Sequence, residues 1–287
     1  MTAVLVATVV VAASGGGRAP RRAEGRAEPG ARVAPRPGRR DAWVATTAVL
    51  DALLPDPAVR RELAGSTVYQ LVGNHDTRPA CGTCVLTAKF DSYQALTRAH
   101  LGAAVRAVLL DLESWTSTPV AEQRAPARFY EVAGRLVHRE HRLFIAAPGL
   151  DLFNRAAAGS GRSDAAVYLD SGLLRAIARD ADVLVVQSQS RERRPAGFAA
   201  LLDRAAAEVA GVNPHVTVLG GISTNPSGRP VTAVTIERAM RLVGPAVGGY
   251  WVNIPGRGAL CPGCGTPRPG VALAVLEHLP GGLQPRA

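Results

Sequence analysis

Short apolar segments alternate with longer amphipathic segments through most of this chain, and this alternation constrains the fold more than any other feature. The short segments are rich in β-branched residues and are bounded by glycine, proline or polar residues, which predicts strands. The longer segments carry apolar residues at helical spacing. Such an alternation implies parallel strands joined by right-handed helical connections. We predict six strands, at residues 66–72, 107–113, 143–148, 182–189, 215–222 and 248–254.

Two weaker apolar segments, at residues 42–47 and 166–169, raise the number of predicted strands to eight. Eight parallel units close into a (β/α)8, or TIM-type, barrel. An open, doubly wound sheet is the alternative, but the glycine-rich G-x-G-x-x-G turn that such sheets carry after the first strand is missing here. The sequence therefore favours an α/β protein with a (β/α)8 barrel, complete or irregular.

Composition divides the 287 residues into four parts. Residues 1–14 are apolar, end in small residues and are shorter than the roughly 20 apolar residues that cross a bilayer, so we predict a secretory signal peptide. No Lys or Arg precedes this run, so a misassigned start codon or a hydrophobic first strand are the alternatives. Residues 15–41 are rich in Arg, Pro and Gly and predict a disordered linker. Residues 42–280 then form the barrel domain and residues 281–287 a tail, and we expect a secreted, extracellular monomer without stable membrane insertion.

The net charge of +10 does not indicate a nucleic-acid partner. Eight arginines and two glutamates lie between Arg18 and Arg40, so the predicted linker alone supplies +6 of this charge. The aromatic residues on which single-stranded nucleic acids stack are not interleaved with these arginines. Of the 33 basic residues only Lys89 is a lysine, which points to biased base composition rather than to a polyanionic partner.

The segment at residues 107–113 carries the principal candidate site. Its apolar residues lead into Asp111 and Glu113, which are two positions apart and therefore share one face of an extended strand. Barrel enzymes hold their chemistry at the carboxyl ends of the strands. We expect both carboxylates at the mouth of the barrel, with Glu113 as general acid and Asp111 as its electrostatic partner. The alternative is a buried strand that ends in a solvated acidic turn.

Polar and aromatic residues follow the other predicted strands. Gln187 and Gln189 repeat the two-residue spacing, and so do Trp251 and Asn253. Together with Trp115 they fit a carbohydrate site, in which amides bind hydroxyl groups and indole faces stack on sugar rings. The alternative is that the amides cap neighbouring strands and the tryptophans close the barrel. The other polar residues at these strand ends are Asn74, His75, Asp76, Asp151, Ser223, Thr224 and Asn225.

Residues 109–113, 143–148, 182–187, 218–221 and 249–251 resemble the second half of a glycosidase barrel of the family-18 chitinase type. That family carries D-x-x-D-x-D-x-E at one strand end. Asp111 and Glu113 match its last two acids, while Arg106 and Leu109 stand where the first two aspartates are expected. The resemblance implies that Glu113 protonates the glycosidic oxygen and that Asp111 steers an acetamido group of the substrate, which acts as nucleophile.

The chain departs from that family after the strand at residues 182–189, where the segment Gln187-Ser-Gln189 replaces an expected tyrosine. A conventional mechanism needs a second carboxylate instead, and Asp76, Glu122 and Asp151 are candidates. The chain is also similar to uncharacterised secreted barrel proteins of actinobacteria, which implies the fold but no reaction. We expect no cofactor in catalysis.

The four cysteines form two C-x-x-C turns, Cys81 with Cys84 and Cys261 with Cys264. One turn follows the first confident strand and the other follows the last, so we expect the two turns at the same rim of the closed barrel. Four thiolates could then hold a structural zinc ion. In an exported protein the same sulfurs would form disulfides, either within each turn or across the rim. A redox-active dithiol is the third alternative.

These features lead to three hypotheses about function. The first is a secreted glycoside hydrolase that acts on a polysaccharide or glycoconjugate by carboxylate acid catalysis. The second is a non-catalytic barrel that binds carbohydrate or cell envelope through Asp111, Gln187, Trp251 and Asn253. The third is a cytosolic barrel stabilised by zinc. Fragments of other enzyme motifs, such as Gly73-Asn-His-Asp76, lack the segments that would complete them.

Overall fold

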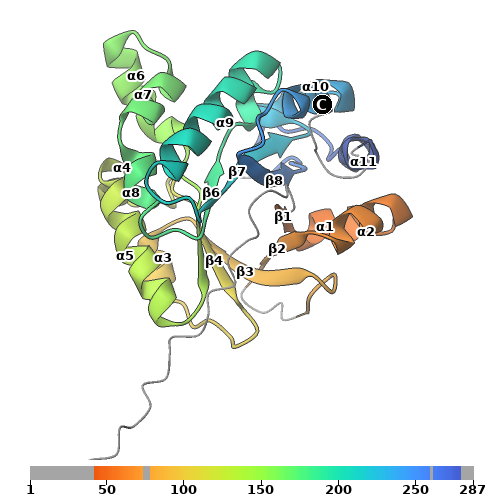
Figure 1. The fold of residues 1–287 in the computed structure, drawn as a ribbon, viewed down its shortest axis with the longest axis horizontal. Coiled ribbons are helices and arrows are strands. Elements are labelled where there is room, and N and C mark those ends of the chain that lie inside the picture. Colours follow the sequence, from red (N-terminus) through yellow and green to blue (C-terminus); the bar gives the residue numbers. More distant parts are fainter. Residues whose placement is uncertain (1–41, 74–77, 259–260, 279–287) are drawn as a thin grey trace, which may run out of the picture. The chain divides into compact units, whose positions relative to one another are not determined.

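Eight parallel strands form a closed barrel, which confirms the predicted TIM-type fold (Figure 1). The computed structural model describes residues 42–73, 78–258 and 261–278. The strands pair in chain order, and β1 pairs with β8 to close the ring. Their bounds are β1 (Ala42–Thr46), β2 (Thr67–Val72), β3 (Cys84–Phe90), β4 (Ala107–Leu110), β5 (Leu143–Ala146), β6 (Val183–Val186), β7 (Thr217–Ser223) and β8 (Val247–Asn253).

Helices cover the outside of the barrel (Figure 1). The described part of the connection from β2 to β3, at residues 78–83, contains no helix. The helices are α1 (Thr47–Leu53), α2 (Pro57–Ala64), α3 (Tyr93–Arg98), α4 (Val120–Arg124), α5 (Pro126–Arg139), α6 (Asn154–Ser160), α7 (Asp164–Asp170), α8 (Leu173–Ile177), α9 (Pro195–Ala210), α10 (Ala233–Arg241) and α11 (Pro269–Glu277), with 3-10 turns η1 (Leu150–Phe153), η2 (Gln189–Arg191) and η3 (Pro226–Gly228). None of the described helices is long and apolar enough to span a membrane.

Alternation along the strands divides the apolar residues between two cores. In β4, Ala107 and Leu109 belong to the cluster inside the barrel. Val108 and Leu110 belong to the cluster between the barrel and the helices. Because successive side chains of a strand point to opposite faces, continuing this alternation turns Asp111 toward the interior. The two cores therefore fix which polar residues can reach the mouth.

The ring closes at a glycine. Gly249 of β8 has a φ of 146°, a conformation that L side chains rarely adopt. A Cβ atom at this position would also overlap the carbonyl oxygen of Ala42 in β1. Next to it, Val44 pairs with Trp251 across the same junction. A close backbone approach that only glycine permits therefore joins the first strand to the last.

Two strand predictions are wrong. Strand β3 (Cys84–Phe90) is not among the eight predicted strands. The segment at residues 166–169 lies instead in α7, because Ser163 caps that helix by accepting a hydrogen bond from the backbone N–H of Ala166. An apolar run of four residues fits either a strand or a buried helical turn, and the capping serine decides between them. Helix α7 packs its buried residues against η1 and α9.

Each C-x-x-C turn forms its own disulfide, Cys81 with Cys84 and Cys261 with Cys264. The expectation that the two turns share one rim is wrong. Cys84 begins β3 and pairs with Val68 near the start of β2. The sulfur of Cys264 lies 3.9 Å from the carbonyl oxygen of Asn225, which follows the end of β7. Since all strands are parallel, the two disulfides lie at opposite ends of the barrel.

The physical reason is the connection between β2 and β3. Without a helix in its described part, this connection itself carries the chain from the carboxyl end of one strand to the amino end of the next, and its cysteines come at the end of that path. Four thiolates cannot meet at one zinc ion in this arrangement. Among the residues that the structure describes, no group of three or more His, Cys, Asp and Glu side chains could hold a metal ion. The predicted signal peptide, linker and tail, at residues 1–14, 15–41 and 281–287, lie outside the described residues.

Candidate active site

Asp111 and Glu113 follow β4 and lie at the carboxyl end of the barrel. The ladder continues past the strand, because the backbone N–H of Asp111 donates to the carbonyl of Phe90 and that of Gly149 donates to the carbonyl of Leu112. Extended backbone keeps residues 111 and 113 on one face, as the spacing predicted. Asp111 is 1% exposed and Glu113 is half-buried. Of the two acids, Glu113 is the one that a ligand can reach.

Two side chains hold Asp111 in place. The ammonium of Lys89, in β3, lies 3.0 Å from Asp111 Oδ2. The amide Nε2 of Gln187, which follows β6, donates to Asp111 Oδ1 at 2.6 Å. Lys89 also pairs with Asp91 and lies 5.2 Å from the ring centroid of Trp115. Asp111 thus connects residues from three strands.

Burial shifts the protonation of the two acids apart. Burial raises the pKa of Asp111 to about 6, although the charge of Lys89 opposes this shift. Burial and then the negative charge of Asp111 raise the pKa of Glu113 to about 9. Of the two acids, Glu113 has the higher pKa and is therefore the one that keeps its proton to higher pH. Two carboxyl groups whose environments separate their pKa values are suited to act as an acid and a charged partner.

Gln187 and Gln189 extend the site from Asp111 toward β7. Besides its bond to Asp111, Gln187 Nε2 donates to the carbonyl oxygen of Ala147 at 3.1 Å. Gln189 lies in η2 rather than in a strand, and its Nε2 donates to Gln187 Oε1 at 3.2 Å. A hydrogen-bonded chain therefore runs from Lys89 through Asp111 and Gln187 to Gln189.

Trp251 completes the floor of the mouth on β8. It belongs to the apolar cluster inside the barrel and is 6% exposed. Its indole Nε1 is buried and has no partner among the described residues. Trp251 pairs in register with Gly221 of β7, whose position on the interior face is filled by the amide of Gln189. The last two strands therefore place Trp251 in register with the glycine that the amide of Gln189 covers.

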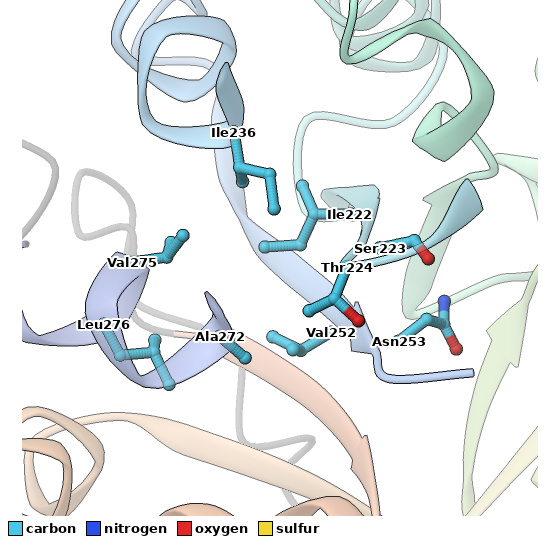
Figure 2. A pocket seen from close by; sticks show the side chains of 9 residues that line it. All are labelled: Ile222, Ser223, Thr224, Ile236, Val252, Asn253, Ala272, Val275 and Leu276. Atoms are coloured by element: carbon cyan, nitrogen blue, oxygen red, sulfur yellow. The ribbon is translucent and has the colours of Figure 1, made fainter. Parts of the chain in front are cut away.

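Asn253 lies at the end of β8 in register with Ser223 of β7. Both residues line a cavity of about 10 Å³ between these strands and helices α10 and α11. Figure 2 shows their polar ends on the side away from the apolar lining residues Ala272, Val275 and Leu276. This cavity is outside the barrel and has room for about one water molecule.

The second-carboxylate candidates have different positions. Asp151 faces Glu113 across Gly149, because an ideal Cβ on that glycine would lie 2.5 Å from Asp151 Oδ1 and 2.6 Å from Glu113 Cγ. Asp151 Oδ2 accepts from the backbone N–H of Ser114, while Oδ1 is buried without a partner among the described residues. Burial raises the pKa of Asp151 above its usual range. Asp151 is therefore the second carboxyl group in contact with the site.

Glu122 is not available as the second carboxylate. It is 3% exposed and accepts hydrogen bonds from the backbone N–H groups of Tyr93 and Gln94, so it stabilises the start of α3. Asp76, together with Asn74 and His75, lies outside the described residues. A cleft of about 510 Å³ between α1 and the connection after β2 is lined by neither Asp111 nor Glu113.

Lys89 was not among the residues selected from the sequence, although one signal was available. It is the only lysine among 33 basic residues, and it stands two positions before Asp91 in an otherwise apolar segment. Burial lowers its pKa, but the charges of Asp111 and Asp91 outweigh that effect and raise it. Lys89 is therefore a fixed cation and not a nucleophilic amine.

Replacing Lys89 with methionine is expected to raise the pKa of Asp111 by about 1–3 units, because an opposite charge at this distance is removed from a buried acid. Carbon NMR of selectively labelled aspartate carboxyl groups measures this shift, and Asp111→Asn assigns the signal. Lys89→Arg keeps the positive charge and serves as the matched control. An Asp111 titration that is the same in the methionine and arginine variants contradicts the assigned role.

Comparison of the chain with models of known protein families and with curated proteins gives no match.

Proposed function

We propose that the chain is a glycoside hydrolase in which Glu113 is the general acid. One observation carries this proposal: half-buried Glu113, whose pKa is raised by burial and by the charge of Asp111, lies beside the buried Asp111 at the carboxyl end of a TIM-type barrel. Glycosidic bonds are hydrolysed by acids of this kind, whose pKa is raised so that they hold a proton at neutral pH. The amide side chains and tryptophans around the mouth support a carbohydrate as the ligand.

In the proposed reaction, Glu113 gives its proton to the glycosidic oxygen, and the bond from that oxygen to the anomeric carbon breaks with its electron pair on the oxygen. The anomeric carbon then carries partial positive charge. The negative charge of Asp111, held by Lys89 and Gln187, stabilises it. Water adds to the anomeric carbon, and the Glu113 carboxylate takes up its proton. The acid is thereby restored.

Asp151 is the proposed second carboxylate. Asp111 is unsuited to attack a sugar, because it is almost fully buried and both of its oxygens have partners. Asp151 has one oxygen without a described partner and faces Glu113. In a mechanism with two carboxylates, this oxygen attacks the anomeric carbon as the glycosidic bond breaks, and water then displaces Asp151 from that carbon while Glu113 takes up the proton of the water.

We further propose that the protein is exported and works outside the cell as a monomer. A disulfide in each C-x-x-C turn is compatible with an oxidising compartment. The apolar residues at 1–14 support a signal peptide.

The test of the proposal is an assay of the full chain on neutral and acidic polysaccharides and on aryl glycosides, with released reducing ends measured between pH 4 and pH 10. We expect hydrolysis of at least one substrate, with kcat/KM rising through about pH 6 as Asp111 ionises and falling through about pH 9 as Glu113 loses its proton. Glycan binding without product would favour the non-catalytic carbohydrate-binding barrel. A chain that neither binds nor cleaves any of these glycans would contradict both the hydrolase and the carbohydrate-binding barrel.

A further inference from the structure

Among the polar groups inside the mouth, the amide of Gln187 has a fixed orientation. Its Nε2 faces two acceptors, the carbonyl oxygen of Ala147 at 3.1 Å and Asp111 Oδ1 at 2.6 Å. A backbone carbonyl can only accept a hydrogen bond, so a nitrogen must stand at this position whatever the charge of Asp111. Gln187 Oε1 must then point the other way.

The orientation of the Gln187 amide also determines the orientation of the Gln189 amide. Since Gln187 Oε1 can only accept, the group that faces it at 3.2 Å must be the Gln189 nitrogen. Gln189 Oε1 is consequently turned away from Gln187, and it is buried without a partner among the described residues. A buried acceptor without a partner costs about 1–3 kcal/mol, and a ligand that donates a hydrogen bond removes that cost.

A free donor belongs to the residue that pairs with Gly221 on the neighbouring strand. Gln189 Oε1 occupies the space above Gly221 where a side chain would otherwise be, since a Cβ at Gly221 would overlap it. Gly221 pairs in register with Trp251, whose buried indole N–H also lacks a partner within the described part of the chain. An unsatisfied acceptor from η2 thus covers Gly221 of β7, and an unsatisfied donor belongs to Trp251, the residue of β8 that pairs with Gly221.

We propose that Gln189 and Trp251 form a subsite for a hydroxyl group of an uncharged sugar. A hydroxyl donates one hydrogen bond and accepts others, so it satisfies Gln189 Oε1 and Trp251 Nε1 together. A carboxylate in the place of this hydroxyl only accepts hydrogen bonds and would leave Gln189 Oε1 unpaired. The inference rests on the proposed function, because it identifies the sugar class that the proposed hydrolase takes.

The charges around the subsite favour the same class. Asp111, Glu113 and Asp151 are acidic groups of the mouth, and an anionic sugar would approach the ionised ones. Lys89 does not compensate, because Asp91 and Asp111 already pair with its ammonium. Like charges that face each other without a counterion oppose binding. Uronic, sialic and sulfated sugars are therefore expected to be excluded at this position.

The experiment measures binding of the full chain to a glycan array that carries neutral oligosaccharides and their uronic-acid counterparts of the same linkage. We expect neutral glycans to bind at least about tenfold more tightly than the matched uronic forms, which corresponds to about 1.4 kcal/mol. Uronic glycans that bind equally well or better would overturn the inference.

Two variants test whether the preference for neutral over uronic glycans depends on Gln189. Gly221→Ala removes no polar group but displaces the Gln189 amide, and Gln189→Glu places a carboxylate oxygen against Gln187 Oε1. Each is expected to weaken binding of the neutral glycan by at least about tenfold, the value of one hydrogen bond. Gly102→Ala is the matched control, because a Cβ there has no atom within 4 Å. Circular dichroism checks folding, and Gln189→Glu remains informative if Gly221→Ala fails to fold.

The outcomes separate this inference from the proposed function. If a neutral glycan binds through Gln189 but is not cleaved, the proposed hydrolase activity is contradicted and the subsite is supported. If uronic glycans are cleaved, or if both variants bind neutral glycans as tightly as the unmodified chain does, the subsite is contradicted and the hydrolase proposal stands. Absence of binding to any glycan would overturn both.

Discussion

Replacing Glu113 with glutamine is expected to lower kcat/KM for glycan hydrolysis at pH 7 by about 10²–10⁴-fold, the usual contribution of a general acid. Glutamine has the size and hydrogen-bonding reach of the protonated acid but no proton to transfer. The loss is expected to be much smaller for dinitrophenyl glycosides, because their leaving group needs no protonation. The fall in activity through about pH 9 should also disappear, because Glu113 is the group that titrates there.

The matched control for this variant is Glu131→Gln. Glu131 lies on the exposed side of α5, where it pairs with Arg135, so the same chemical change occurs far from the mouth. Its hydrolysis rates are expected to equal those of the unmodified chain. Equal losses on activated and unactivated glycosides in Glu113→Gln would exclude an acid role for Glu113, and an unchanged rate would exclude Glu113 from the reaction.

Replacing Glu192 with glutamine is expected to make the fold more stable at alkaline pH. Glu192 is fully buried beside the end of β7, where Oε1 accepts from the backbone N–H of Ser223 and Oε2 has no partner among the described residues. Burial raises its pKa to about 9. Glutamine keeps the acceptor for Ser223 and cannot ionise.

The sign of the effect follows from proton binding in the two states. Between the unfolded pKa near 4.5 and the folded pKa near 9, the folded chain holds a proton on Glu192 that the unfolded chain has lost. The free energy of unfolding therefore falls as pH rises through this window, by up to about 1.4 kcal/mol per pH unit. The variant lacks this contribution, so its advantage should be absent at pH 4 and amount to several kcal/mol at pH 8.

Urea unfolding of both proteins at pH 4, 6 and 8 measures the difference. Glu113 also has a raised pKa and adds a slope of the same sign, but this slope is common to both proteins and cancels in the comparison. Glu131→Gln again serves as the exposed control, and its free energy of unfolding should depend on pH in the same way as that of the unmodified chain. A stability difference that does not change with pH would show that Glu192 is ionised in the fold.

The barrel was predictable because its signal is repeated along the chain. The strand before Asp111 is an uninterrupted apolar segment that ends in two acids at alternate positions, so the period of the strand determined which way both would face. The same reasoning placed Gln187 and Trp251 at the mouth. The hydrophobic pattern thus contained both the fold and the end of the barrel at which its polar residues collect.

The errors arose where polar residues interrupt the apolar pattern of a strand. Strand β3 carries Thr87 and Lys89 on its interior face and follows a turn with a disulfide, so its sequence did not indicate a strand. That omission also hid Lys89 and misplaced the first C-x-x-C turn at the wrong end of the barrel. The orientation of the Gln187 and Gln189 amides depends on contacts with residues about 40 or more positions away along the chain, such as Ala147 and Asp111, and sequence spacing does not encode it.

The junction at Gly249 has a consequence for the order of assembly. Trp251 belongs to the final strand, and its neighbours in β1 were synthesised about two hundred residues earlier. A growing chain that stops before Gly249 has an open sheet edge on both sides and no enclosed mouth. The mouth of the barrel is therefore enclosed only after β8 has left the ribosome and paired with β1.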